Sequence, residues 1–552
     1  MIAVIIIILI AAAIFVALRA YHLHTVNVMK EKAEQAQLCY EDLKEKLQVE
    51  APADVIFSLN ARRFWQLLGA CFKDNPFPRV KVVLCFLRLK AVVRLFNREK
   101  VVQTGPASAV LTLNTVLADE ISKVRNGESN KSTVECDVAF AGLQVIRLYM
   151  MAYHGNDFFR NERCTSGMRV NNALNGSFYK YETKDGRKFS AHVYYESQKA
   201  KLMKALKLET PPENFTMSTL KKDKLDVANA VKSHKAEELE ELAFSSGACG
   251  CMLRTREEWE HSEFGKAVCD MPLYRLEKVS EAPVKNYGKS SEKGPLSGIK
   301  VLDLTHIIAG PACTRLLAEQ GAEVTLIRRG HFESQEQAML ELDGWAGKHL
   351  VSLDFNDPKE LEIAKGMVRE ADVIVCSYQC GVFDKFGLSI KDIHKLNPNA
   401  IYGSMTCFSD TVWRDRPGWA PLAEDITGLS IRNGSAEKPK NLNGVPLDYI
   451  PGFIMATGIM KAIKLSMTEG GAYNVSCALT RAGYWLHECT DLCYDGKLHV
   501  KTSKIEKNTE TKLWNSVLTE TRDTAVGTVK FPSPAVYTQD GADLCSNMRF
   551  WE

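Results

Sequence analysis

The chain has 552 residues, a length that predicts three to four domains at about 150 residues each. Apolar residues make up 45% of it and charged residues 25%, which excludes a disordered, collagen-like or polytopic membrane protein. Its 70 lysines and arginines nearly balance 67 aspartates and glutamates, so the net charge is only +3. This balance predicts no nucleic-acid partner.

The first stretch departs from this average composition. Residues 2–18 are almost entirely Ile, Val, Ala and Leu, and about 17 apolar residues reach the lower length of a membrane span. A cleaved secretory signal is the alternative, but it usually has a basic start, which is missing here. We therefore expect a single transmembrane anchor over residues 1–20. Arg19, Lys30 and Lys32 follow it, so the positive-inside tendency places the rest of the chain in the cytosol.

The cysteines do not indicate a disulfide-rich or zinc-binding protein. Sixteen cysteines are about 3% of the chain, and most stand alone inside apolar segments. No Cys-x-x-Cys pair occurs, and Cys249-Gly-Cys251 is too closely spaced for an ordinary zinc site. We interpret them as free thiols in a reducing compartment and expect no metal.

The first half contains helical segments and one hairpin. Residues 21–50 are charged and predict a helical stalk, whereas 51–102 are apolar with interleaved Lys and Arg. That second segment is either a buried helix pair, which we favour, or a segment lying at a membrane surface. A helix is predicted over 110–124. Two alternating runs joined by Lys184-Asp185-Gly186 predict a hairpin over 178–195, and helices are expected at 197–208 and 235–246.

After a linker at 281–295, rich in Lys, Ser, Pro and Gly, short strands alternate with helices. This alternation predicts an α/β fold with a Rossmann-like doubly wound parallel sheet. The turn at 305–311 follows the first strand, where such sheets bind ligands, but it lacks the Gly-x-Gly-x-x-Gly pattern of dinucleotide sites. The strands are expected at 300–304, 322–327, 350–353, 372–376 and 400–404, and the helices at 311–320 and 358–370.

Short motifs follow one another from about Leu296 to Leu486. They include Gly298-Ile-Lys-Val-Leu-Asp-Leu-Thr-His-Ile-Ile-Ala-Gly-Pro, Gly321-Ala-Glu-Val, Gly347-Lys348, Arg416-Pro-Gly-Trp and Gly470-Gly-Ala-Tyr-Asn-Val-Ser. In this order they resemble the family III CoA-transferases, the CaiB/BaiF family, which includes formyl-CoA:oxalate CoA-transferase and alpha-methylacyl-CoA racemase. The resemblance implies a Rossmann-like large domain with a small α+β domain. It also implies acyl-CoA and carboxylic acid substrates, with coenzyme A as co-substrate and no metal.

The resemblance also implies a catalytic residue, Asp448. In the family, an aspartate at this position attacks the acyl-CoA thioester and forms a mixed anhydride, from which an aspartyl-CoA thioester arises. The acceptor acid then takes the CoA. The alternative is that Asp448 only caps the helix near Gly452, a common role for aspartate.

The family's CoA contacts are carried over to six positions. Two of these positions are expected near phosphates. Arg329 keeps the family's arginine, and Lys385 stands where an arginine often binds phosphate and keeps its positive charge. The expected contacts are Arg329 near the adenosine phosphates, Leu353 on the adenine side, Ser377 and Tyr378 in place of an Asn-Phe pair, and Lys385 with Phe386.

Several positions depart from the family pattern. Ile308 replaces a glutamine near the nucleophile, Ala420 replaces a frequent acidic residue, and Trp419 stands where the racemase has a histidine. Racemisation needs a paired acid and base, so that activity is not expected. His306 is an acid/base candidate, although a structural role is favoured. The alternative to a transferase is a non-catalytic relative that binds CoA or scaffolds a partner.

An internal echo suggests two related units. Val134, Cys136, Ala141 and Gly142 have the same spacing as Val475, Cys477, Ala482 and Gly483. Residues 51–280 resemble a degenerate family unit that keeps the small domain and has no aspartate matching Asp448. We therefore expect a large domain at 296–490 and a returning C-terminal segment at 491–552. The protein would form a homodimer or an intramolecular pseudo-dimer.

Overall fold

The protein is described here by a computed structural model. It describes residues 30–49, 53–58, 100–129, 131–150, 152–154, 178–193, 195–209, 217–328, 341–410, 413–494, 519–524, 527–532 and 536–538. The anchor expected at 1–20, most of the apolar segment 51–102 and Arg329 lie outside the described residues. Residues 30–47 form a helix, as the expected stalk requires, but its inner face is buried against the protein core through Cys39, Tyr40 and Leu43.

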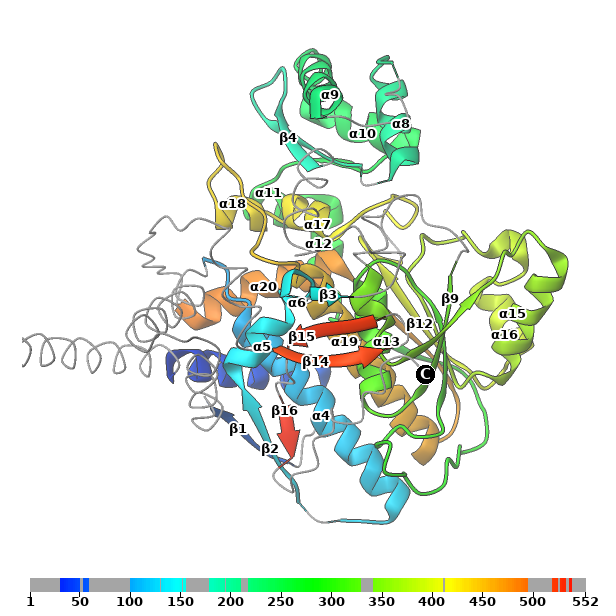
Figure 1. Cartoon of the computed structure of the whole chain (residues 1–552). Coiled ribbons are helices and arrows are strands. Elements are labelled where there is room, and N and C mark those ends of the chain that lie inside the picture. Colours follow the sequence, from blue (N-terminus) through cyan, green and yellow to red (C-terminus); the bar gives the residue numbers. More distant parts are fainter. Residues whose placement is uncertain are drawn as a thin grey trace, which may run out of the picture.

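A seven-stranded sheet forms the centre of the second half (Figure 1). The five expected strands are confirmed as β8 to β12, with ends within two residues of their expected positions. Six strands are parallel, whereas β7 pairs antiparallel with β13. The prediction of a wholly parallel sheet is therefore wrong at this edge, because β7 precedes the linker and enters the sheet from the opposite direction. The order is β10 (Lys348–Ser352), β9 (Glu323–Arg328), β8 (Lys300–Leu304), β11 (Val373–Cys376), β12 (Ile401–Thr406), β13 (Ala472–Ala478) and β7 (Arg275–Ser280).

Helices cover the two faces of this sheet unequally. The alternation of strand side chains sends Val301, Val373 and Val375 toward α13 (Ala309–Glu319) and α19 (Pro446–Thr468). Leu302 and Ile374 point the other way, toward α15 (Pro358–Glu370) and α16 (Ile390–Leu396). The short 3-10 helices η2 (Leu342–Trp345) and η3 (Asp384–Phe386) lie in the connections.

The first half repeats part of this arrangement. Strand β1 (Asp54–Ser58) pairs parallel with β2 (Thr133–Asp137), which pairs antiparallel with β16 (Val536–Thr538). Strands β12, β13 and β7 have the same directions, and β2 and β13 carry the echoed Val-x-Cys spacing. Thus β7, from the first half, completes the sheet of the second half, while β16, from the end of the chain, completes the sheet of the first.

Each half also contributes one long helix to the core. Helix α4 (Thr104–Asn126) packs against α19, and both have 23 residues. The expected helix at 110–124 is confirmed as α4, and Gly127 ends it with φ 71°, the left-handed conformation that glycine adopts easily. Asn114 of α4 donates hydrogen bonds to the Phe453 carbonyl at 3.0 Å and the Thr457 hydroxyl at 3.1 Å of α19.

A small domain projects from the main body at the top of Figure 1. It contains the antiparallel strands β4 (Phe178–Glu182), β5 (Lys188–His192) and β6 (Gly250–Met252), so the predicted hairpin is confirmed. Helices α8 (Glu196–Ala205) and α10 (Ala236–Ser246) confirm the two expected helices, and α9 (Met217–Val231) lies between them in sequence. The remaining elements are α5 (Val138–Gln144), α6 (Arg147–Met150), β3 (Ala152–His154), α11 (Arg256–His261), α12 (Glu263–Cys269), α17 (Ala420–Ile426), α18 (Leu429–Asn433), α20 (Leu479–Tyr494), β14 (Thr519–Thr524) and β15 (Gly527–Pro532).

The expected linker at 281–295 contains no helix or strand, but it is bound to the protein. The guanidinium of Arg125 donates hydrogen bonds to the carbonyl oxygens of Tyr287, Gly288 and Pro295 at 2.6–3.0 Å. Lys285 forms an ion pair with Asp372 at 2.9 Å. The segment between the halves therefore has a fixed path along the surface.

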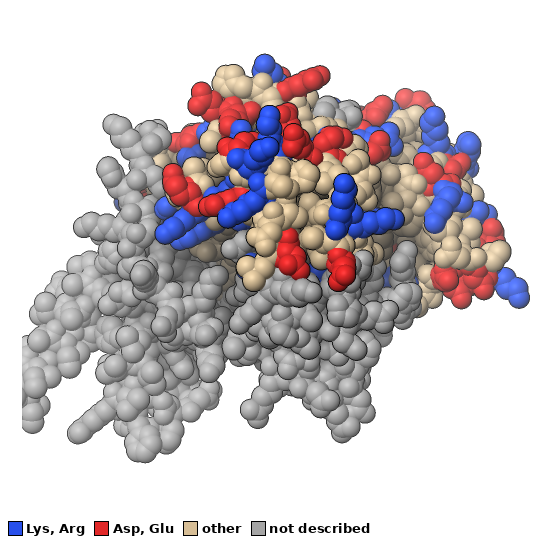
Figure 2. Space-filling view, turned by 90° about the horizontal axis from the view of Figure 1, so that it is seen from above, with Lys and Arg blue, Asp and Glu red and all other residues tan. Residues whose placement is uncertain are grey.

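Within the described part of the chain, α19 alone is long and apolar enough to cross a membrane. Of the most apolar 18-residue stretch of α19, 78% is buried inside the protein, as expected for a core helix. Figure 2 shows Lys and Arg side chains mixed with Asp and Glu over the face seen from above, in agreement with the balanced composition.

Candidate active site

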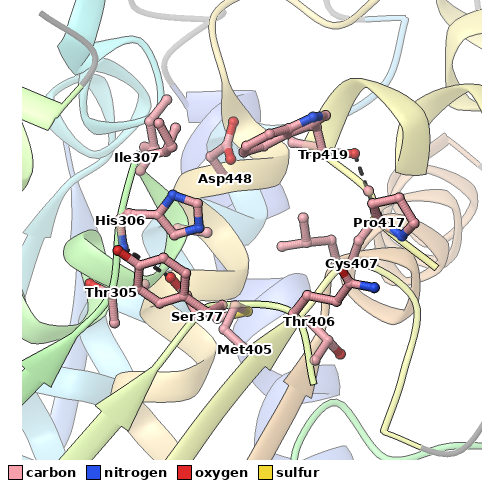
Figure 3. Close-up of a pocket in the computed structure, with 18 of the residues that line it drawn as sticks. Thr305, His306, Ile307, Ser377, Met405, Thr406, Cys407, Pro417, Trp419 and Asp448 are labelled. Carbon is pink, nitrogen blue, oxygen red and sulfur yellow. Dashed lines mark hydrogen bonds between the residues drawn. The ribbon is translucent and has the colours of Figure 1, made fainter. Parts of the chain in front are cut away.

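A cavity of about 320 Å³ opens at the carboxyl ends of β8, β11 and β12. The neighbouring strands β8 and β11 mark the point where the strand order reverses, which is where open α/β sheets bind ligands. Figure 3 shows the turn after β8 and Ser377 after β11 on one side of the cavity. Asp448 and Trp419 lie above it, and the end of β12 lies opposite.

A buried ion pair holds the turn after β8. The Lys348 ammonium donates hydrogen bonds to Asp303 at 2.7 Å, to the Thr314 hydroxyl at 2.7 Å and to the Pro311 carbonyl at 3.0 Å. Burial lowers the pKa of Lys348, although Asp303 favours the charged form. Asp303 also accepts hydrogen bonds from the backbone and hydroxyl of Thr305, at 2.9 and 2.5 Å. The Asp and Lys of the sequence motifs therefore shape the turn from below.

The backbone of this turn is strained at the cavity wall. Ile307 has φ 66°, a conformation that a β-branched residue rarely adopts. The surrounding contacts hold it there, because the His306 backbone N–H donates to the Ser377 hydroxyl at 3.1 Å and Lys348 bonds the turn below. Strain of this kind concentrates at functional sites.

Neighbours on three sides fix the His306 ring. It stacks on Tyr378 with a centroid distance of 4.2 Å and meets the Trp419 ring edge-on at 6.1 Å. The Tyr195 hydroxyl lies 3.2 Å from His306 Nδ1. Tyr195 precedes α8 in the small domain, so the first half of the chain contributes directly to this cavity.

Asp448 lies in the first turn of α19 and lines the cavity. Val445 is the N-cap residue, so the alternative role, that Asp448 only caps the helix, is wrong. Among the described residues, no group forms a hydrogen bond or ion pair with its carboxylate. Burial, helped by the negative charge of Glu424, raises the pKa of Asp448 to about 8, although its side chain keeps some exposure to the cavity.

Glu424, the neighbour of Asp448, is a second carboxyl with a perturbed pKa. Burial raises its pKa to about 7, while hydrogen bonds from the Leu442 backbone N–H at 2.9 Å and the Asn441 amide at 2.8 Å oppose this shift. These bonds fix Glu424 behind the cavity wall, where it does not line the cavity. Its negative charge therefore acts on Asp448 from a distance.

Both halves hold the start of α19 in place. The Tyr449 hydroxyl donates a 2.8 Å hydrogen bond to Asp343, which also forms a buried ion pair with Arg147 of α6. Arg315 of α13 lies 3.7 Å from the same carboxylate. At Gly452, a Cβ atom would approach the Ala309 carbonyl oxygen to 2.5 Å, so the absence of a side chain allows α19 to lie close to α13.

The small domain also positions the opposite wall of the cavity. The Trp419 indole N–H donates to the Gln198 amide oxygen at 3.3 Å, and its ring lies 5.6 Å from Tyr195. Ile308 and Ala420 both line the cavity, so the positions that depart from the family pattern lie at the site.

A buried cluster clamps the small domain onto α17, the helix that begins next to Trp419. Asp425 accepts hydrogen bonds from Lys180 at 2.5 Å and Ser190 at 2.5 Å, and His192 lies 3.1 Å away. Lys180 and His192 keep the pKa of Asp425 low despite its burial. Ser190 and Asp425 both contact the same imidazole nitrogen of His192, Nε2, so these side chains do not form a catalytic relay through the two ring nitrogens. All three side chains are buried. Their role is to join the domains.

The structure brings together only some of the expected CoA-binding residues. Ser377 and Tyr378 line the same cavity as Asp448, whereas Leu353 is buried beside the sheet and Lys385 is exposed on η3. Tyr378 and Phe386 are nevertheless connected, because successive ring contacts of 5.1–5.8 Å run from Tyr378 through Phe383 and Phe355 to Phe386. The ammonium of Lys385 lies 4.7 Å from the Phe386 ring.

Sequence reasoning missed Tyr195, Gln198, Arg328 and Arg414, which also line the cavity. Tyr195 ends the predicted hairpin and Gln198 lies in the predicted helix at 197–208. Neither residue is part of a catalytic or binding motif, so nothing local in the sequence marks them. Among the described residues, no group of three or more His, Cys, Asp or Glu side chains is arranged to hold a metal ion.

Comparisons with known proteins find similar sequences and structures. The family model described as CoA-transferase family III matches residues 296–529. An acyl-CoA transferase of Gibberella moniliformis is 31% identical over 268 residues, which are 46% of this chain and 47% of that protein. A formyl-CoA:oxalate CoA-transferase of Rhodopseudomonas palustris is 28% identical over 195 residues, which are 33% of this chain and 46% of that protein. This chain thus spans about half the length of the curated relatives it matches.

Among solved structures, a CaiB/BaiF family protein from Brucella suis is 22% identical, with a TM-score of 0.35. The match covers 43% of this chain and 65% of that one.

Proposed function

We propose that the protein transfers CoA between an acyl-CoA and a carboxylic acid, with Asp448 as the nucleophile, because residues 296–529 match the model of CoA-transferase family III. One observation carries the proposal. A carboxylate with no hydrogen-bond donor among the described residues lines a cavity at the point where the strand order of the sheet reverses.

The proposed reaction needs a carboxylate at this position. Asp448 attacks the thioester carbonyl, the carbon–sulfur bond breaks, and CoA thiolate departs. The product is a mixed anhydride between Asp448 and the acyl group. The thiolate then attacks the aspartyl carbonyl and releases the first acid, which leaves an aspartyl-CoA thioester. The acceptor carboxylate attacks that thioester and again displaces the thiolate, which gives a second mixed anhydride, now between Asp448 and the acceptor. Attack of the thiolate on the acceptor carbonyl gives the new acyl-CoA and restores Asp448.

The surroundings of Asp448 support this chemistry. Because no donor solvates the carboxylate, its ionised form is a reactive nucleophile. The first backbone N–H groups of α13, at Ala309 and Gly310, lie at the cavity wall. Such groups have no partner within their helix and stabilise negative charge, so we infer that they bind the oxyanion that forms during attack.

The proposed CoA path runs along the aromatic rings between the cavity and the surface. Ser377 and Tyr378 would contact the reactive end, and Phe386 and Lys385 would meet the nucleotide end. Leu353 packs in the same cluster as Phe386, which supports its expected adenine-side position. Arg329 remains a sequence-based proposal for the phosphates.

We also propose that the two halves of one chain replace a dimer. The reciprocal pairing of β7 and β16 supports this, as does the contribution of Tyr195 to the cavity. Light scattering of the full chain would test it, since a monomeric mass is expected for the active protein and an obligate homodimer would contradict the proposal.

From the sequence alone, we propose that residues 1–20 anchor the protein to a membrane with the catalytic part in the cytosol. Membrane fractions washed with alkaline carbonate should retain the full chain. Its complete release would contradict an integral anchor.

Trapping the covalent intermediate tests the central proposal. The full chain is incubated separately with formyl-, acetyl- and succinyl-CoA, quenched with hydroxylamine and digested for mass spectrometry. We expect a hydroxamate at Asp448 in the wild type and in Asp357→Asn, an exposed helix-cap aspartate. None is expected in Asp448→Asn.

A non-catalytic CoA-binding protein is the second candidate function. The apolar side chains of Ile308 and Ala420 at the cavity favour it, because they supply no polar group to the reacting atoms. CoA binding measured by calorimetry, without an Asp448 adduct from any of the three donors, would support this candidate against the transferase.

A further inference from the structure

The loop at residues 413–419 carries the motif Arg416-Pro-Gly-Trp, which takes no part in the proposed reaction steps. It precedes α17 and forms part of the cavity wall. A Cβ atom on Gly418 would approach the Cys407 sulfur to 2.5 Å, and the Cys407 thiol donates a hydrogen bond to the Trp419 carbonyl at 3.5 Å. The loop therefore lies directly over Cys407, which also lines the cavity.

Arg416 of this loop is held between two aromatic rings. Its guanidinium carbon lies 4.0 Å from the centre of the Trp413 ring and 4.3 Å from that of Phe244, a residue of α10 in the small domain. The Arg416 side chain is only 14% exposed, and cation–π contacts strengthen as water is removed. The ion pair with Glu241 of α10, at 2.8 Å, adds less because that carboxylate is 62% exposed. The two rings therefore fix the guanidinium more than the ion pair does.

Trp413 fixes the start of the loop. It has φ 54°, which is uncommon for a residue other than glycine, and its ring stacks on Phe264 of α12 with a centroid distance of 4.0 Å. The Trp413 carbonyl accepts a 2.9 Å hydrogen bond from the Arg416 backbone N–H. A strained backbone of this kind persists only where its surroundings hold it. Phe244 and Phe264 both precede the linker, so aromatic side chains of the first half fix a cavity wall of the second half.

We propose that Arg416 is a positioning residue, which keeps the loop 413–419 closed beside Asp448 and thereby excludes water from the acyl intermediate. The inference rests on the proposed function. Trp419 of the loop and Asp448 line the same cavity (Figure 3), so an open loop would admit solvent to the reacting carboxylate.

Water at this place has a defined chemical consequence. Its oxygen bonds to the acyl carbonyl of the mixed anhydride, the bond to the Asp448 oxygen breaks, and the free acid leaves. Water thus supplies a hydroxyl group to the acyl carbon and a proton to the CoA thiolate. The acyl-CoA is then hydrolysed without transfer of CoA, and Asp448 returns to its starting state.

Alkylation by N-ethylmaleimide tests the closure of the loop in the full chain without any substrate. In Arg416→Ala, labelling of Cys407, followed by peptide mass spectrometry, is expected to become on the order of 10-fold faster, because losing both ring contacts raises the population of the open loop. Cys313, buried on α13, should label as slowly as in wild type. Arg416→Lys should give an intermediate rate, since lysine keeps the charge but cannot stack as a plane. Arg256→Ala, which loses a contact with the Tyr484 ring away from the cavity, is the matched control and should behave as wild type at both cysteines.

A second readout compares hydrolysis of the acyl-CoA with CoA transfer. The donor that forms the Asp448 adduct is supplied with acetate or succinate as acceptor, and free CoA and the new acyl-CoA are both measured. The ratio of hydrolysis to transfer is expected to rise several-fold in Arg416→Ala and to stay at the wild-type value in Arg256→Ala. Loss of folded protein lowers both rates together, so this ratio separates positioning from stability.

Two outcomes would overturn the inference while leaving the proposed function intact. One is labelling of Cys407 in Arg416→Ala that is unchanged or that rises equally at Cys313, and the other is an unchanged ratio of hydrolysis to transfer. Phe244→Leu keeps Arg416 and removes only the ring on the small-domain side, so it should also speed labelling of Cys407 and serves if Arg416→Ala does not fold. Wild-type labelling in Phe244→Leu would contradict the inference. If no donor forms an Asp448 adduct, the proposed function fails instead, and labelling of Cys407 still tests the closure by itself.

Discussion

The hydroxyl of Tyr195 lies 3.2 Å from Nδ1 of His306, and this contact joins the small domain of the first half to the turn that follows β8. The His306 ring, stacked on Tyr378, thereby keeps one orientation at the cavity. The first half contains no aspartate at the position that matches Asp448, yet it completes the cavity in which Asp448 lies. The first half thus supplies residues to a cavity whose proposed nucleophile lies in the second half.

Replacing Tyr195 with phenylalanine tests this positioning role. Removing one hydrogen bond is expected to lower kcat/KM for CoA transfer by roughly 2- to 10-fold, because the imidazole loses its fixed orientation. The measurement is steady-state transfer with the donor that labels Asp448. Tyr484→Phe is the matched control, since it loses a 2.9 Å hydrogen bond to Glu260 on α11, away from the cavity. Equal losses in both variants would indicate a general effect on stability.

The raised pKa of Asp448 predicts the pH dependence of the first step. In the proposed reaction only the ionised carboxylate attacks the thioester, so the rate of adduct formation should rise with pH and level off above about 8. Quenched-flow labelling between pH 6 and pH 9.5 would follow it, with buffers held at constant ionic strength. A rate that is already constant from pH 6 upward would show that the carboxylate is ionised at neutral pH.

The same group affects stability. The folded state keeps the Asp448 proton up to about pH 8, whereas the unfolded chain loses it near the ordinary value of 3.8. The unfolded state therefore binds fewer protons between these values, and stability falls as pH rises through this range. Asp448→Asn should gain stability relative to wild type from pH 4 to 8, with no further gain above. Urea unfolding at several pH values measures the difference, and a constant difference would contradict the raised pKa.

The buried Lys348–Asp303 pair should be essential for the turn after β8. Lys348→Met leaves a buried carboxylate without its partner, which is expected to cost about 3–5 kcal/mol of unfolding free energy. The double variant Asp303→Asn with Lys348→Met should be less destabilised, because no charge is left unpaired. Lys300→Met removes an exposed pair with Glu370 and should change stability by less than about 1 kcal/mol. Denaturant unfolding of the three variants measures these costs.

Two helical glycines should respond in opposite ways to alanine. In Gly452→Ala, the new Cβ meets the Ala309 carbonyl oxygen, so α13 and α19 must separate at a cost of about 1–3 kcal/mol. In Gly366→Ala, on α15, the Cβ meets no atom within 4 Å, and the better helix propensity should add about 0.5–1 kcal/mol. Thermal unfolding compares the variants. Two changes of the same sign would contradict the close approach of the helices.

Local pattern was enough to find much of the fold. The strands β8 to β12 follow from short apolar runs, and the hairpin of β4 and β5 follows from Lys184-Asp185-Gly186, where Gly186 has φ 73°. The motif order pointed to CoA-transferase family III and to Asp448, because these residues lie at fixed positions along one segment. The sequence could not show that Asp303 and Lys348 form one ion pair, since 45 residues separate them.

Composition, strand and helix periodicity and the order of the motifs are properties of neighbouring residues, and the sequence by itself determined them. Only the tertiary structure decided that β7 and β16 exchange between the halves and that Tyr195 and Gln198 complete the cavity of Asp448. These features depend on contacts between residues far apart in the chain, and such contacts form only when burial of the shared core brings the two halves together.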